Sequence, residues 1–513
     1  MDTTSPGHVV FAVVLFNLRE ARGWSQQDLA DKLNELADKR GINIEVSANT
    51  VSRWERGVIK RPHPLIRQLL AELFEVPVEA LGVTRKRAEP AAPITSQDQP
   101  PGPASMPAPH LKPPALDPSA TAPSDEIEHA WRRWRAVRGG LNEHRIELSE
   151  SAAQLHRAAL RVEDTALLSC PGWLPAAPVE LGAVMLEWVD APNTPQVIGT
   201  EREAQGVRPP LPDGRRYQRY TQALRDLDPP RLFENRVSYR LVDVAWDAAD
   251  SGKLAFGLTT YFEVVDVCEA LAHELAAAHL EFAPTGASVA PPSWKRLPLR
   301  KLIGDPFDLS RRPVLPSINT LTIRKADSSA TFVLHSRDAG RVAVCGGMFH
   351  VMPAGVFQPS SMSPAARAHD FDLWRNMMRE YSEEFLGNLE HDGNLGGLVD
   401  YEADEPFRSL SQARQEGGIR LCCLGVGLDP LTLWGEILTV AVIDADVFDE
   451  VFRDLVTTNS EGTVVRAGSR KAGAVPGIPF TEERVEQLLG PQPMAPAAAG
   501  CLALAWRHRS AIL

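Results

Sequence analysis

Three glutamates gather on one side of a predicted helix in the last third of the chain. They are Glu380, Glu383 and Glu384, in the stretch DFDLWRNMMREYSEEFLG that runs from Asp370 to Gly387. Residues spaced i, i+3 and i+4 are neighbours on a helix, so the carboxylates share an arc of about 100°. Carboxylates this close repel one another unless a cation lies between them, and Mg²⁺ or Mn²⁺ prefers such oxygen ligands. The spacing therefore predicts a divalent metal site; the alternative is a solvated acidic helix face.

The helix that carries the glutamates needs a buried side to hold them in place. Apolar residues recur at helical spacing beside the acidic arc and predict that side. Asp370 is expected to cap the first turn of this helix, and Gly387 is expected to end it. The residues of the predicted buried stripe are Trp374, Met377, Met378, Tyr381 and Phe385.

Residues 379–384, REYSEE, resemble the R-E-U-x-E-E core of the Nudix box, in which U is a bulky apolar residue. Upstream, residues 352–358, MPAGVFQ, resemble the P-G-G-x-x-E sequence that opens the box. The resemblance implies that Glu380, Glu383 and Glu384 hold a divalent metal for hydrolysing nucleoside diphosphates linked to another group. It also implies that Arg379 orients the helix.

The box departs from the family pattern in its first half. Ala354 stands where the family has a glycine, and Gln358 stands where it has a glutamate. The core arginine, Arg379, lies ten residues further along the chain than the box spacing requires, and Gly387 is displaced by one. The box is thus split and partly degenerate while its metal-binding core is retained. Loss of the first glutamate lowers catalysis more than binding, which favours a ligand sensor over a hydrolase.

A second stretch has residues suited to reading DNA. Residues 47–57, SANTVSRWERG, predict a helix whose small and polar residues press into a groove. Val51 and Trp54 lie three apart, so they share the face that packs on the preceding helix. Basic residues in the following loop are expected to meet phosphate. The predicted DNA-binding residues are Gln26, Gln27, Ser47, Ala48, Asn49, Thr50, Ser52, Arg53, Lys60 and Arg61.

The preceding helix is predicted to begin at Ser25, with Asp28 completing a capping box. LREARGWSQQDLADKL and TVSRWERG together resemble the lambda-repressor-like, or XRE, family of helix-turn-helix domains, over roughly residues 9 to 83. The link from Leu33 to Ser47 is longer than the family's tight turn, and we expect it to extend the second helix by about two turns. The resemblance implies binding to double-stranded DNA as a homodimer. The alternative is a small helical bundle that binds protein.

Charge and cysteine content set the broad class. The formal net charge is −12, yet residues 1–87 carry 13 Lys and Arg against 11 Asp and Glu, a net of +2. The other residues therefore carry −14, which fits DNA contact by the N-terminal part alone. None of the six scattered cysteines forms a C-x-x-C, a pattern typical of a reduced, cytoplasmic protein. The run from Val9 to Leu15 is too short to span a membrane, and it follows no basic segment.

The composition predicts a multidomain chain. Residues 1–85 are expected to be an all-α helix-turn-helix head, and residues 86–125, rich in proline and alanine, a disordered linker. Residues 126–300 are expected to form an α+β domain. Because Glu274 aligns with Glu380, we hypothesise that this domain is a diverged copy of the last one. Residues 301–513 are expected to be a Nudix-like α/β sandwich. In the middle domain, Trp131 and Trp134 indicate a packing helix rather than a nucleic-acid contact.

These features together favour a transcription regulator. Its head binds DNA, and its Nudix-like body senses a nucleotide-type ligand or mediates assembly. One alternative is a Mg²⁺-dependent pyrophosphohydrolase with a DNA-targeting head. A second alternative is a scaffold whose body binds protein.

Overall fold

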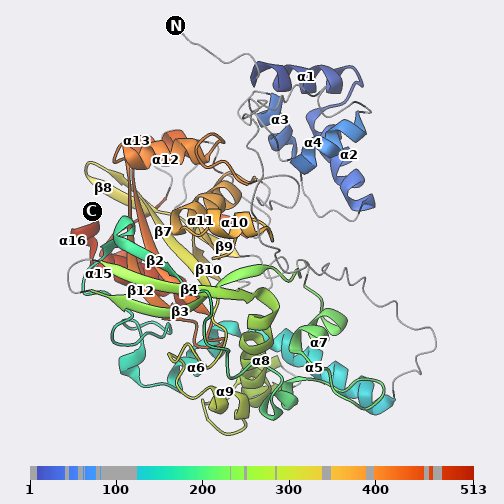
Figure 1. Ribbon diagram of the computed structural model, residues 1–513, viewed down its shortest axis with the longest axis vertical. Helices are drawn as coiled ribbons and strands as arrows, with labels where there is room; N and C mark the ends of the chain where they lie inside the picture. The colour runs from blue at the N-terminus through green and yellow to red at the C-terminus, as the bar shows by residue number, and fades with distance from the viewer. Residues whose placement is uncertain are drawn as a thin grey trace, which may run out of the picture. The chain divides into compact units, whose positions relative to one another are not determined.

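The structure, a computed structural model, divides the chain into two compact units, residues 1–124 and 125–513 (Figure 1). We call them the helical unit and the α/β unit. The chain is therefore multidomain, with a helical N-terminal region followed by a mixed α/β body. The described residues are 8–40, 46–55, 62, 64–74, 76, 81, 124–230, 233–247, 251–283, 286–337, 348–388, 398–453, 455, 462–465, 477–490 and 492–513.

Helices of the helical unit pack around a small apolar core. Phe11, Leu15, Leu33, Val51 and Trp54 are among its buried side chains. The predicted second helix does run on past Leu33, since it ends only at Lys39. Nearly all of the predicted linker lies outside the described residues. The helices described here are α1 (His8–Glu20), α2 (Gln26–Lys39), α3 (Ala48–Glu55) and α4 (Pro64–Leu73).

A seven-stranded sheet forms the centre of the α/β unit. Its two central strands, β13 and β7, are parallel, and the other pairings in the sheet are antiparallel. In spatial order the sheet contains β1 (Val179–Glu180), β12 (Ile419–Leu428), β13 (Gly435–Asp444), β7 (Pro316–Ala326), β8 (Ser329–Phe332) and β15 (Ile478–Pro479), with β11 (Ala354–Val356) also paired to β7.

Smaller sheets flank this centre. One contains β2 (Val184–Trp188), β4 (Gly252–Thr260) and β3 (Val237–Trp246); a second contains β10 (Phe349–Val351), β9 (Leu334–Arg337) and β14 (Gly462–Val465); a two-stranded sheet contains β5 (Leu280–Ala283) and β6 (Gly286–Val289). The helices are α5 (Asp125–Glu143), α6 (Arg145–Gln154), α7 (Tyr220–Leu227), α8 (Tyr261–His279), α9 (Pro298–Ile303), α10 (Pro364–His369), α11 (Leu373–Glu380), α12 (Phe407–Gln415), α13 (Ala445–Val451), α14 (Glu482–Leu489), α15 (Pro496–Arg507) and α16 (Arg509–Ile512).

Helices cover both faces of the large sheet. Successive strand residues point to opposite faces, so strands such as β12 contribute side chains to two separate cores. Along β12, Leu421 and Cys423 belong to the core under α11, α12 and α13. Cys422 and Leu424 belong to the other core, which α15 covers. The alternation of apolar residues on both faces explains why this strand reads as a continuous hydrophobic run.

The predicted domain boundary near residue 300 lies inside the α/β unit. β3 is joined to segments beyond that boundary, since Tyr239 N donates to Phe357 O at 3.2 Å and Leu241 N donates to Val314 O at 2.8 Å. The rings of Tyr239 and Phe357 also lie 4.5 Å apart. One hydrophobic core therefore draws on both predicted domains. Residue 300 lies between β3 and β4, which belong to a three-stranded sheet, and β7, which belongs to the seven-stranded sheet of the same folded unit.

The aromatic helix α5 packs inward as predicted. The Trp131 indole donates to Pro210 O at 2.7 Å, and the buried Trp134 indole donates to Val207 O at 2.9 Å. No helix among the described residues is long and apolar enough to cross a membrane.

Candidate functional site

The helix that carries the three glutamates has the predicted buried stripe and a different N-terminal cap. α11 continues into a π-helical turn, Tyr381–Phe385, and we call this whole segment the acidic helix. The Asp372 carboxylate accepts the N–H of Arg375 at 2.9 Å, so Asp372 is the cap and the prediction of Asp370 was wrong. Gly387, with φ of +65°, accommodates the left-handed turn that ends the segment. The five stripe residues, Trp374, Met377, Met378, Tyr381 and Phe385, are all buried.

Asp370 instead lies at the centre of a buried polar network. Its side chain is fully buried and accepts hydrogen bonds from Ser360 N at 2.7 Å, Ser360 Oγ at 2.6 Å and Tyr401 Oη at 2.8 Å. Tyr401 Oη in turn accepts from Arg379 Nη1 at 2.7 Å. Arg379 Nη1 lies 3.4 Å from the Asp370 carboxylate, so the buried guanidinium has a counter-charge.

Arg379 makes two further hydrogen bonds through its other terminal nitrogen. Its Nη2 donates to Gln358 O at 2.5 Å and to Asn376 Oδ1 at 3.0 Å. The bond to Gln358 ties the acidic helix to the end of the MPAGVFQ segment. Sequence reasoning missed Asp370 and Tyr401, because no local pattern connects residues that meet only in the folded unit.

Two of the glutamates lie against the upstream segment that resembles the opening of the box. Ala354 N donates to Glu384 Oε1 at 3.3 Å. A Cβ placed on Gly355 would lie 2.0 Å from Glu380 Cδ, so only glycine permits this approach. Glu384 is buried, while Glu380 and Glu383 are partly exposed. The MPAGVFQ segment and the acidic helix therefore meet in space.

The metal prediction rests on the donor chemistry of this acidic helix. Its donors are carboxylate oxygens, which suit Mg²⁺ or Mn²⁺. In the described part of the chain, no three or more His, Cys, Asp or Glu side chains stand in an arrangement that would hold a metal ion. Glu380 and Glu384 are turned toward the backbone at residues 354 and 355.

In the helical unit, buried ion pairing fixes α3. Arg19 on α1 donates from Nε to Glu55 Oε1 at 2.6 Å and from Nη2 to Glu55 Oε2 at 3.1 Å. Both side chains are at most 6% exposed, and the hydrogen bond with Glu55 raises the pKa of Arg19. Gln26 on α2 donates to the same carboxylate at 2.8 Å. Three helices thus meet at Glu55.

The N-terminus of α3 presents polar residues, and its other side is buried. Ser47 Oγ accepts from Thr50 N at 3.2 Å and so caps the helix. Val51 and Trp54 are buried, as their spacing predicted. The predicted capping box of α2 is also present: Asp28 N donates to Ser25 Oγ at 3.0 Å, and Ser25 N donates to Asp28 Oδ2 at 2.7 Å.

The predicted DNA-binding residues divide by exposure. Gln27 and Ser47 are exposed, and Gln27 donates to Asp31 at 2.8 Å. Gln26 is partly exposed, and its side-chain amide donates to the Glu55 carboxylate. Ala48, Thr50 and Ser52 are partly exposed; the side chains of Asn49 and Arg53, and the whole of Lys60 and Arg61, lie outside the described residues.

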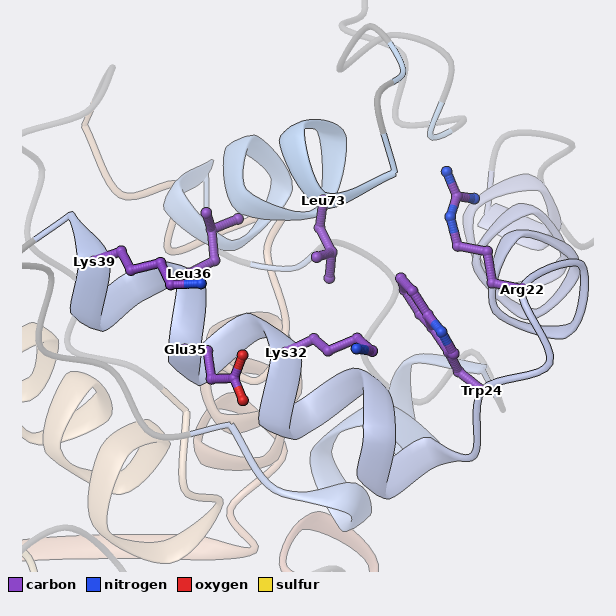
Figure 2. A pocket seen from close by; sticks show the side chains of 7 residues that line it. All are labelled: Arg22, Trp24, Lys32, Glu35, Leu36, Lys39 and Leu73. Carbon is purple, nitrogen blue, oxygen red and sulfur yellow. The ribbon is translucent and has the colours of Figure 1, made fainter.

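A surface hollow of about 400 Å³ lies in the helical unit, between α2, α4 and Trp24. Figure 2 shows the side chains that line it. Lys32 Nζ lies 5.1 Å from the Trp24 ring centroid, and the Arg22 guanidinium lies 4.9 Å from that of Phe74. Arg22 Nη2 also donates to Phe74 O at 2.7 Å. These contacts fasten the end of α1 to the end of α4. The lining residues are Arg22, Trp24, Lys32, Glu35, Leu36, Lys39 and Leu73.

A family model described as the SP15 N-terminal domain matches residues 15–82. The match falls within the helical unit and includes none of the α/β unit. A comparison with curated proteins finds no match.

Proposed function

We propose that the chain is a DNA-binding transcription regulator whose α/β unit senses a nucleotide-type ligand or mediates assembly. The observation that carries the proposal is the way α3 is held. Glu55 joins α3 to α1 and α2 through Arg19 and Gln26, while Val51 and Trp54 bury its other side. A recognition helix needs this combination of a rigid back and a polar N-terminus.

Binding of selected double-stranded DNA by the full chain tests this proposal. A random-sequence selection identifies the site, and affinity is then measured at rising salt, where phosphate contacts predict a steady loss. Arg53→Ala should weaken binding by about 1–3 kcal/mol if Arg53 reads a base. The matched control is Arg40→Ala, which removes the same charge from an exposed pair with Glu72. Equal binding by both variants and the wild type would contradict the assignment of α3, and sedimentation with and without DNA tests the expected homodimer.

For the α/β unit, we propose that the acidic helix binds a nucleotide-type ligand together with Mg²⁺ or Mn²⁺. The support is the contact of Glu380 and Glu384 with residues 354–355, which brings together the two segments that resemble parts of the Nudix box. Thermal unfolding of the full chain with Mg²⁺ and a panel of nucleotides and nucleotide sugars tests this. A ligand at a hundred times its dissociation constant adds about 2.7 kcal/mol. No shift with any member of the panel would favour a protein-binding scaffold.

The same contacts favour a second candidate, a Mg²⁺-dependent pyrophosphohydrolase. In that reaction a bound Mg²⁺ or Mn²⁺ would activate water and neutralise the diphosphate. Phosphate release from several nucleotide diphosphate substrates separates the two candidates. The sensor predicts no release above that of Glu383→Gln. Release that is lost in Glu383→Gln and kept in Glu416→Gln, a change at an exposed glutamate just after α12, would establish the hydrolase instead.

A further inference from the structure

A second hollow, of about 250 Å³, lies beside the three-stranded sheet of β2, β4 and β3 in the α/β unit. Its walls come from three separate segments of the chain. The segment after β2 contributes Pro192 and Asn193, β3 contributes Arg240 and Val242, and the loop after α9 contributes Leu309 and Ser310. Apolar and polar side chains thus meet around one charged group.

Arg240 is buried in this wall without a carboxylate partner. It is 3% exposed, and its Nη1 donates to Asn193 O at 2.7 Å while its Nη2 donates to Leu309 O at 3.3 Å. Its Nε has no acceptor, and no acid among the described residues forms an ion pair with it. A guanidinium has five N–H donors, and these bonds use two of them. Donors and a positive charge are therefore left over at the edge of a hollow.

Other buried arginines of the chain are compensated differently. Arg138 and Arg379 have carboxylates within reach, at Glu269 and Asp370. Burial lowers the pKa of Arg240, and the nearby charge of Glu263 opposes that shift. A buried cation without an ion pair is costly, and an anion in the hollow would lower that cost. Arg300 and Arg312 also donate to carbonyls, but neither lines this hollow.

A glycine keeps the wall of the hollow close to Arg240. Gly257 on β4 is the register partner of Arg240 on β3. A Cβ at position 257 would lie 2.6 Å from Pro192 Cγ, so the glycine lets the segment after β2 approach the sheet. The close approach brings Asn193 O to the guanidinium.

We propose that this hollow binds a small organic carboxylate with a branched apolar body. The carboxylate meets the remaining Nη N–H donors of Arg240, since a guanidinium can bind a carboxylate through two of its N–H groups. Val242, Leu309 and Pro192 contact the apolar part. The neighbouring acid, Asp308, is engaged by Ser310 N and Oγ at 3.0 and 2.6 Å. At about 250 Å³ the hollow is smaller than a drug-sized pocket, which favours a small ligand. This assignment does not depend on the proposed function.

Calorimetric titration of the full chain with isovalerate tests the proposal. Isovalerate has a carboxylate and a branched body, isovaleramide has the same shape without the charge, and inorganic phosphate has charge without the body. We expect saturable binding of isovalerate and none of isovaleramide. Failure of isovalerate to bind would overturn the proposal. Binding of phosphate without isovalerate would also overturn it, since the apolar walls would then have no role.

Variants locate the binding at Arg240. Arg240→Gln should lower the affinity for isovalerate about tenfold to a hundredfold, the range for a hydrogen bond to a charged group. Arg135→Gln, at an exposed arginine of α5, is the matched control and should leave it unchanged. If Arg240→Gln does not fold, Gly257→Ala decides: it keeps the guanidinium and displaces Pro192, and should weaken binding at least tenfold. Unchanged affinity in a folded Arg240→Gln, or in Gly257→Ala, would overturn the proposal. Arg240 would then only hold the segments of Asn193 and Leu309 in place through its hydrogen bonds.

Discussion

Single buried residues in the α/β unit have roles that their sequence neighbours do not reveal. Asp370 and Asp372 both precede the acidic helix, yet one is a buried acceptor and the other a cap. Their types are identical, so the difference comes from Ser360 and Tyr401, which reach Asp370 only in the folded chain. Replacing each aspartate by asparagine therefore separates the two roles.

Asp370→Asn should destabilise the α/β unit by about 3 kcal/mol, because it leaves the buried Arg379 without its counter-charge. Asp372→Asn should change stability by a few tenths of a kcal/mol at most, since asparagine caps a helix as well as aspartate does. Urea unfolding followed by tryptophan fluorescence measures both. Equal stability of the two variants would show that Arg379 does not depend on Asp370.

His273 provides a pH-dependent contribution to stability. It stacks on Trp134 at 5.1 Å, and its Nδ1 lies 3.1 Å from Tyr220 Oη. Burial, with the charge of Arg138, lowers the pKa of His273 from 6.5 to about 3. The folded chain keeps this imidazole neutral where the unfolded chain would protonate it. Stability is therefore present in full above pH 6.5 and is lost as pH falls toward 3.

Between pH 6.5 and 5 this histidine should account for a loss of about 2 kcal/mol. Urea unfolding at both pH values measures the loss in the wild type and in His273→Gln. The variant should be less stable at neutral pH and should lose about 2 kcal/mol less across the interval. An identical loss in both proteins would show that His273 is not the group responsible.

At the scale of elements, the acidic helix packs directly against β11 because Gly355 has no side chain there. Gly355→Ala places a Cβ 2.0 Å from Glu380 Cδ and must push the carboxyl away. Overpacking of this kind costs about 1–3 kcal/mol. Gly206→Ala is the control, since nothing lies within 4 Å of a Cβ there.

Thermal unfolding should show a lower midpoint for Gly355→Ala and an unchanged midpoint for Gly206→Ala. The nucleotide panel adds a second readout, because the displaced Glu380 should also lose any ligand-induced shift. A Gly355→Ala protein as stable as the wild type would mean that the helix and strand separate without cost.

Much of the secondary structure followed from local patterns. The stripe from Trp374 to Phe385 and the Ser25–Asp28 capping box depend on residues a few positions apart, so the sequence predicted them. The same kind of signal was overlooked at Thr260 and Glu263. Glu263 Oε2 accepts from Thr260 N at 2.9 Å, so this capping box marks the start of α8 at Tyr261.

The candidate sites were predictable only where the chemistry is local. Glu380, Glu383 and Glu384 are visible as a spacing, and the structure adds that residues 354–355 lie against two of them. Arg240 has no such signal, because its hollow is built from segments that are far apart in the sequence.

For the whole molecule, the division into units follows core formation rather than changes of pattern. The helical unit has a core of its own around Leu33 and Trp54. The α/β unit has cores that draw on residues from both sides of position 300, as the bonds of Tyr239 and Leu241 show. A ligand that binds anywhere in the α/β unit therefore acts on one folded body.

The large sheet also sets the order in which the chain can fold during synthesis. β1, at Val179, pairs with β12 at Cys423, about 240 residues later. β7 similarly pairs in parallel with β13, which is synthesised later. At about 5–20 residues per second, the ribosome needs roughly 10–50 s after β1 to synthesise its partner strand, β12. During that interval the residues of the helical unit have all been synthesised, while the early strands of the α/β unit have emerged without their partners.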